Sequence, residues 1–156
     1  MQDKTTLIST SQFHKDVYTG LTDFPKHISS KYFYDAKGDK LFQEIMDMPE
    51  YYLTNSEYKI LDQFKDEICG VFFEDSKEFD LVELGAGDGK KTKILLRHLS
   101  SKGIPFQYIP IDISENALNE LELSINNELP SVEVKTLQGT YFETLEQLCK
   151  MQHRKK

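Results

Sequence analysis

The glycine-rich turn at residues 85–89 is the part of the sequence best suited to chemistry. Its surroundings are Glu83-Leu84-Gly85-Ala86-Gly87-Asp88-Gly89, an acidic residue followed by glycines at every second position. Glycine permits positive φ and lacks the Cβ that would keep backbone away from a ligand. The free N–H groups of a helix that begins after such a turn attract electron-rich groups. The turn therefore predicts a nucleotide or nucleoside site, although Asp88-Gly89 also suits an ordinary tight turn.

The spacing of the glycines distinguishes between types of nucleotide-binding turn. The phosphate loop of NTPases would require glycine where Leu84 stands and Ser or Thr where Lys91 stands. The dinucleotide fingerprint GxGxxG would require glycine at Lys90. Both patterns fit poorly. A nucleoside site without these phosphate contacts is favoured, with a dinucleotide-dependent dehydrogenase as an alternative.

An acidic residue follows the next predicted strand. Asp112 ends the run Tyr108-Ile109-Pro110-Ile111-Asp112 and lies roughly 20 residues after the glycines. A carboxylate in that place accepts hydrogen bonds from both ribose hydroxyls. Asp112 is therefore a candidate ribose ligand. The alternative is that it merely ends a strand before a helix cap at Ser114.

The second half of the sequence predicts the sheet that would position these residues. Apolar strands at 79–84, 106–111 and 132–137 alternate with amphipathic helices over about 90–101, from Ser114, and around Phe142. The order βαβαβα implies parallel strands joined by right-handed crossovers. We therefore expect an α/β fold that is the first half of a doubly wound sheet.

The first 76 residues have a helical pattern instead. Ser11 is expected to cap a short helix that ends at Gly20. Thr54-Asn55-Ser56-Glu57 is typical of a capping box, opening a helix that ends at Gly70. We therefore expect two parts, an N-terminal helical segment over 1–76 and a partial Rossmann-like domain that carries the nucleoside site over 77–156.

Composition argues against several classes of protein. The net charge of −7 is spread among mixed signs, which argues against a nucleic-acid partner. There is no apolar run long enough for a membrane span and no secretory signal, so we expect a cytoplasmic protein without a membrane partner. Cys69 and Cys149 lie far apart and are expected to be buried or half-buried. The four His are scattered, so no metal is expected.

Several stretches resemble the histidine-specific N-alpha-methyltransferases. They are Lys31-Tyr32-Phe33-Tyr34-Asp35, Gly38 with Leu41-Phe42, Met48-Pro49-Glu50-Tyr51-Tyr52-Leu53-Thr54, and Leu84-Gly85-Ala86-Gly87 with Lys91-Thr92. The glycine turn also resembles motif I of class I methyltransferases, which wraps the amino-acid end and ribose of S-adenosylmethionine (SAM). The resemblance covers roughly residues 20–145. It implies SAM as cofactor, a class I methyltransferase sheet, and methylation of the alpha-amine of histidine or a similar amino acid, the first step of ergothioneine synthesis.

The resemblance also implies roles for individual residues. Gly85 and Lys91 would hold the methionine end of SAM, where the Lys91 charge suits a carboxylate, and Asp112 would hold its ribose. The full set of expected cofactor-binding residues is Tyr34, Gly85, Ala86, Gly87, Gly89, Lys91, Asp112, Thr140 and Tyr141. Tyr51 is expected at the substrate imidazole. Core packing is the alternative for Tyr34 and Tyr51, and catalytic residues remain unassigned.

The sequence departs from the family pattern in two places. Where the family has Gly-Asp-Phe to bind the adenine amine, this chain has Gly139-Thr140-Tyr141, so a charge-assisted contact is lost and weaker cofactor binding is expected.

The second departure is that the chain ends at Lys156, whereas family members continue with further strands and a substrate domain. An incomplete sheet of three strands is expected, with the strand at 79–84 on an open edge that favours a homo-oligomer, most simply a symmetric dimer. Whether the chain is an active enzyme stays open. The alternative function is a truncated SAM-binding or interaction module without turnover.

Overall fold

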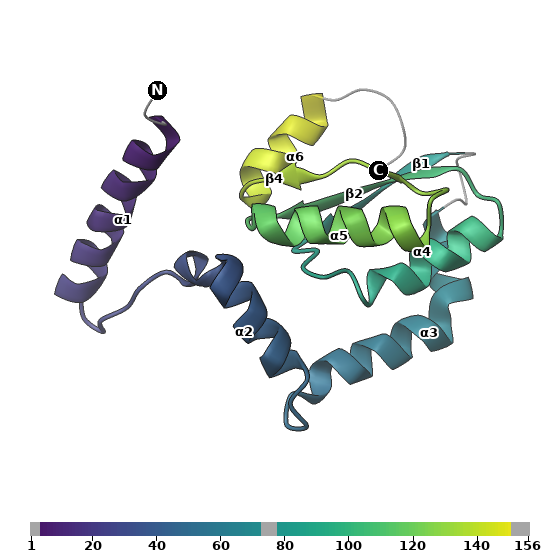
Figure 1. The fold of residues 1–156 in the computed structure, drawn as a ribbon, viewed down its shortest axis with the longest axis horizontal. Coiled ribbons are helices and arrows are strands. Elements are labelled where there is room, and N and C mark those ends of the chain that lie inside the picture. Colours follow the sequence, from purple (N-terminus) through teal and green to yellow (C-terminus); the bar gives the residue numbers. More distant parts are fainter. Residues whose placement is uncertain (1–3, 73–77, 151–156) are drawn as a thin grey trace. The chain divides into compact units, whose positions relative to one another are not determined.

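In the described part of the chain, helices come first and the strands follow from Phe79 onward (Figure 1). The computed structural model describes residues 4–72 and 78–150. In order, its elements are α1 (Lys4–Thr22), the 3-10 helix η1 (Ser30–Phe33), α2 (Ala36–Met46), α3 (Tyr52–Phe72), β1 (Phe79–Leu84), α4 (Thr92–Ser101), β2 (Phe106–Asp112), α5 (Glu115–Glu128), β3 (Glu133–Val134), β4 (Leu137–Gln138) and α6 (Tyr141–Lys150). The predicted α/β class is confirmed.

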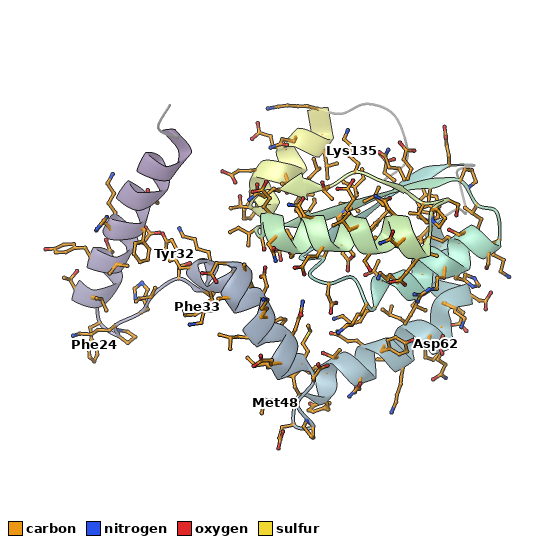
Figure 2. All side chains as sticks on the ribbon, in the orientation of Figure 1. Phe24, Tyr32, Phe33, Met48, Asp62 and Lys135 are labelled. Carbon is orange, nitrogen blue, oxygen red and sulfur yellow. The ribbon has the colours of Figure 1, made fainter. Side chains whose placement is uncertain are left out.

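The chain divides into two compact units, Met1–Phe33 and Tyr34–Lys156. In the first unit, Asp16 of α1 accepts hydrogen bonds from Lys31 Nζ at 2.6 Å and from the Tyr32 hydroxyl at 2.5 Å (Figure 2). The hydrogen bond from Lys31 contributes most to lowering the pKa of Asp16 to about 2. The boundary predicted between residues 76 and 77 lies inside the second unit, in a stretch outside the described residues, and stays a prediction.

The sheet is parallel, as the strand and helix order predicts. β1 pairs with β2 along its whole length, from Phe79 opposite Phe106 to Leu84 opposite Ile111. On its other side β2 pairs with β3 and then with β4, which together replace the single strand predicted at 132–137. Lys135, between them, still donates its N–H to the Tyr108 carbonyl at 2.9 Å. Within the described residues β1 has a strand partner on one side only.

Side-chain alternation along the strands gives the sheet two apolar faces of different size. The larger core lies between the sheet and helices α3, α4 and α5; its buried members are Cys69, Phe79, Ala86, Leu95, Leu96, Leu99, Phe106, Tyr108, Leu121, Ile125 and Val132. The smaller core consists of Ile109, Ile111 and Leu148, with Val82 and Leu137 packed against it. Figure 1 shows α6 on this smaller face and α5 on the other. The sheet is therefore well covered on one face and covered mainly by α6 on the other.

The two cysteines differ in environment. Cys69 of α3 is fully buried, and burial raises the pKa of its thiol to about 11. Cys149 is exposed, so the expectation that it is buried or half-buried is wrong. It lies in α6, off the face formed by the buried residues Thr144 and Leu148, which are four positions apart.

Two predicted helix starts are wrong. α1 runs from Lys4 to Thr22, so Ser11 lies inside it and not at its start. α3 begins at Tyr52, directly after a turn in which the Tyr51 N–H donates to the Met48 carbonyl at 3.0 Å. Thr54 and Glu57 therefore lie inside the helix, and Thr54 is not the residue that caps its start.

The actual caps are at other polar residues. Asp35 caps α2, and its carboxylate accepts a hydrogen bond from the Gly38 N–H at 2.8 Å. The three-residue spacing between Asp35 and Gly38 is one that N-cap hydrogen bonds use. Ser114 caps α5 as predicted, accepting from the Ala117 N–H at 3.1 Å. The helix from Ser114 therefore starts directly after Asp112, at the end of β2.

Candidate functional site

The glycine turn follows β1 at the carboxyl end of the sheet. Gly85, Gly87 and Gly89 have φ values of +72°, +54° and +63°, which L side chains adopt only with strain. The N–H groups of Gly85 and Ala86 both donate to the Ile111 carbonyl, at 2.8 and 3.1 Å. The turn therefore folds back over the end of β2.

Each of the three glycines meets a different environment. A Cβ on Gly85 would lie 2.7 Å from the Tyr141 hydroxyl oxygen, and one on Gly89 would lie 2.3 Å from Leu121 Cδ1. A Cβ on Gly87 would have nothing within 4 Å. Gly89 thus lets the start of α4 approach α5, whereas Gly87 presents bare backbone to open space.

Asp112 lies directly beside this bare backbone. Its Oδ2 accepts the Gly87 N–H at 3.0 Å, and its Oδ1 accepts the Ser114 N–H at 3.0 Å. The residue is 9% exposed, so these two bonds hold the carboxylate in a fixed place. A carboxylate oxygen accepts more than one hydrogen bond, so both oxygens keep capacity for a ligand. The two halves of the predicted nucleoside site are therefore in direct contact.

Glu83 has a supporting position under the turn. It accepts hydrogen bonds from the hydroxyls of Thr92, at the start of α4, and Tyr108, in the middle of β2. Burial raises the pKa of its carboxyl. Glu83 thus joins β1, β2 and α4 beneath the glycines and holds the two ends of the turn in place.

Lys91 stands where α4 begins and is paired with a residue from a distant helix. Its Nζ forms an ion pair with the carboxylate of Glu57 in α3. Further along the same two helices, Asp66 Oδ1 of α3 lies 3.2 Å from His98 Nε2 and 3.5 Å from Lys102 Nζ. α3 therefore runs alongside α4 and brings Glu57 to the turn, a contact that the sequence analysis missed.

Thr140 and Tyr141 lie at the start of α6, beside the same turn. The N–H and hydroxyl of Thr140 both donate to Glu143 Oε2, at 3.2 and 2.6 Å, and these bonds lower the pKa of Glu143. The reach of Glu143 back to the Thr140 N–H is half of a capping box. The Thr140 hydroxyl oxygen keeps acceptor capacity, and the Glu143 carboxylate lies next to the position where the family has Asp.

Tyr34 and Tyr51 flank α2. Asp39, in the first turn of α2, accepts a hydrogen bond from the Ser114 hydroxyl at 2.7 Å, two residues beyond Asp112. Tyr34 comes directly before Asp35, the N-cap of α2, and is half exposed. Tyr51 packs edge-to-face on Phe42, with ring centroids 6.2 Å apart. α2 is thus held near Asp112, and a contact of either tyrosine with a ligand stays a prediction.

A hollow of about 410 Å³ borders the turn on the side of α2 and α5. Its lining includes Gly87, Asp39 and the nearly buried Lys93. Lys93 Nζ donates to Ser124 Oγ at 2.5 Å and to Glu128 Oε1 at 2.6 Å. The described residues include no group of His, Cys, Asp and Glu that could hold a metal ion. In the same part of the chain, no helix is long and apolar enough to cross a membrane.

The family model and the curated relatives that match this chain agree with each other. The family model described as "Histidine-specific methyltransferase, SAM-dependent" matches residues 13–156. Histidine N-alpha-methyltransferase of Mycobacterium tuberculosis is 35% identical over 134 residues, which make up 86% of this chain and 40% of that protein. Ergothioneine biosynthesis protein 1 of Schizosaccharomyces pombe is 33% identical over 121 residues, 76% of this chain and 16% of that protein. The chain thus spans less than half the length of these curated relatives.

Among solved structures, an O-methyltransferase from Bacillus cereus in complex with SAH matches with a TM-score of 0.47 and 16% identity. The match covers 92% of this chain and 58% of the other.

Proposed function

Because this chain belongs to the SAM-dependent, histidine-specific methyltransferase family, we propose that it binds SAM at the glycine turn and serves N-methylation of the alpha-amine of histidine or a similar amino acid. One observation carries the proposal. The Asp112 carboxylate accepts the Gly87 N–H at 3.0 Å, and the space where a Gly87 side chain would stand has no atom within 4 Å. One nucleoside can therefore reach both groups at once.

The residues around the turn fit the parts of this cofactor. Asp112 would accept the ribose hydroxyls, since its oxygens are held by only one N–H each. Lys91 would face the methionine carboxylate, and Thr140 would accept the adenine amine. Further contacts in the proposal are those of Tyr34, Gly85, Ala86, Gly87, Gly89 and Tyr141.

In the proposed reaction the residues of this chain act mainly by positioning. Bound SAM supplies a methyl group on a sulfonium that is transferred by in-line displacement. Positioning of donor and acceptor is the chief contribution a protein makes to such a step. We propose that Tyr51 faces the imidazole of the substrate. The accepting amine must be neutral, and we assign no catalytic base among the described residues.

The alternative function that we propose is a SAM-binding or interaction module without turnover. We further propose a homo-oligomer formed through the open edge of β1, a cytoplasmic location, where SAM and histidine are metabolites, and no nucleic-acid partner.

Two measurements separate these functions. The first is a calorimetric titration of the chain with SAM and with S-adenosylhomocysteine; the second is incubation with methyl-labelled SAM and histidine. Binding with labelled histidine product supports the enzyme, and binding without product supports the module. Absence of binding to either ligand contradicts both, and binding of NAD in their place supports a dehydrogenase.

The variant Asp112→Asn tests the observation that carries the proposal. An amide at this position puts its NH₂ against the N–H of Gly87 or Ser114 and removes a charge-assisted acceptor. S-adenosylhomocysteine should bind about tenfold more weakly or worse. Asp62→Asn, on the exposed face of α3 (Figure 2), is the control and should bind as the wild type does. A thermal melt shows whether both variants fold. Unchanged binding by Asp112→Asn would remove the ribose role.

A further inference from the structure

The ammonium group expected to hold the cofactor carboxylate already has a carboxylate partner. Lys91 Nζ is ion-paired with Glu57 of α3, 34 residues earlier in the chain. Lys91 is the N-terminal flanking residue of α4, and no side chain caps that helix. The uncapped N–H groups of a helix start also favour a negative group. Glu57 therefore presents to α4 the same chemical group that the methionine part of SAM would present.

Packing of α3 on α4 keeps Glu57 in this place. Leu61 and Ile68 of α3 pack against the large core, and Cys69 is buried in it. Asp66 of α3 lies within 3.5 Å of Lys102 Nζ, further along α4. Glu57 lies on the part of α3 that precedes a kink at Phe64, and on that side of the kink Leu61 packs against the core.

We propose that Glu57 occupies the carboxylate subsite of the unliganded protein and is displaced when the cofactor binds. This inference rests on the proposed function. Lys91 Nζ has three donors on a single point charge, so two carboxylates beside it share one countercharge and repel each other. Glu57 therefore lowers the affinity for ligands that carry an amino-acid carboxylate and leaves the affinity for the bare nucleoside unchanged.

The experiment compares two ligands that differ in the amino-acid end. S-adenosylhomocysteine has its carboxylate and ammonium groups, and 5′-methylthioadenosine has neither. Glu57→Gln should bind S-adenosylhomocysteine about two- to fivefold more tightly, which is the range expected for release from one exposed ion pair. Its affinity for 5′-methylthioadenosine should equal that of the wild type. Calorimetric titration of the full chain measures both.

Two further variants make the result specific. Asp62→Asn removes a carboxylate from the same helix, where it pairs with Lys65 instead of Lys91, and should leave both affinities unchanged. Lys91→Met removes the shared countercharge, so adding Glu57→Gln to it should no longer change the ratio of the two affinities. A thermal melt of each variant shows that it is folded.

The outcomes separate this inference from the proposed function. If the wild type binds neither ligand, the proposed function fails. If it binds S-adenosylhomocysteine and Glu57→Gln binds it equally or more weakly, the displacement model is wrong while the cofactor site stands. An equal gain of affinity for 5′-methylthioadenosine would also overturn the model, because the effect would not involve the carboxylate.

Discussion

At the scale of single residues, Gly87 and Gly89 lack side chains for different physical reasons. Both have positive φ, of +54° and +63°. Only Gly89 has a neighbour in the space of a Cβ, at 2.3 Å from Leu121 Cδ1, and Leu121 is itself 1% exposed. The absence of a side chain therefore serves packing at Gly89 and access to the backbone at Gly87.

Replacing each glycine by alanine should separate the two effects. Gly89→Ala should lower the free energy of unfolding by about 2–4 kcal/mol, because backbone strain adds to overpacking against Leu121. Gly87→Ala should cost only the strain, about 1–2 kcal/mol, but its methyl group would stand where the nucleoside is proposed to lie. Denaturant unfolding and titration with S-adenosylhomocysteine measure these effects. A stable Gly87→Ala protein with wild-type affinity would place the ligand elsewhere.

The residues of the site differ in how far the sequence can predict them. Gly87 and Asp112 were predicted because a positive-φ turn and the end of a strand are local features, and the contact between them then follows from parallel pairing of β1 with β2. The partner of Lys91 was missed. Glu57 lies 34 residues away, and only the packing of α3 on α4, which the sequence pattern does not specify, brings the two charges together.

At the scale of elements, polar residues near helix starts gave both correct and wrong predictions. Ser114 caps α5 as expected, whereas the signal at Thr54 and Glu57 lies inside α3. The sequence Thr140-Tyr141-Phe142-Glu143 has the same spacing, and there Glu143 does bond the Thr140 N–H. A capping pattern in the sequence indicates which backbone N–H groups its side chains could bond if the helix began there. Where an earlier turn begins the helix, as the one ending at Tyr51 does, the residues of the pattern no longer stand at the helix start.

The contact between α4 and α5 gives a prediction about pH. The hydrogen bond from Lys93 is the largest of the causes that lower the pKa of Glu128 from 4.5 to about 2. The charge of Lys93 and the hydrogen bond from Arg97 also lower it. A carboxyl whose pKa is lowered in the folded state contributes its full stability above its unfolded pKa and loses it as the pH falls through the folded value. Glu128→Gln should therefore be less stable than wild type at neutral pH.

The difference between the two proteins should shrink as the pH falls from about 4.5 to about 2. Denaturant unfolding at a series of pH values measures it. Glu146→Gln is a matched control, since its exposed partner Lys150 lies on the same helix and joins no second element. A stability difference for Glu128→Gln that does not change over this pH range would show that its ion pairs contribute nothing.

At the scale of the whole sheet, the order and direction of the strands were predictable, but the extent of the last strand was not. Parallel pairing follows from the helix-length connections. The break between β3 and β4 was not predicted, because residues 132–137 have no proline or glycine that would mark it. How the helices cover the two faces of the sheet also depends on tertiary packing, which the sequence pattern does not specify. Near the edge, the Oδ1 atom of Asp80 in β1 is buried without a hydrogen-bond partner among the described residues.

Because β1 has a strand partner on one side only among the described residues, we predict that the chain associates through β1. An edge strand with free N–H and C=O groups is a template for pairing with another strand, and Leu84, at its end, is 46% exposed. We expect the chain to form a dimer or larger oligomer at micromolar concentration, measured by size exclusion with light scattering. Leu84→Lys should shift it toward the monomer, because lysine on an edge strand opposes pairing. Leu123→Lys is the control, since Leu123 is 64% exposed on α5 and should not affect association. A folded wild-type monomer across this range would show that the edge of β1 does not pair with a second copy.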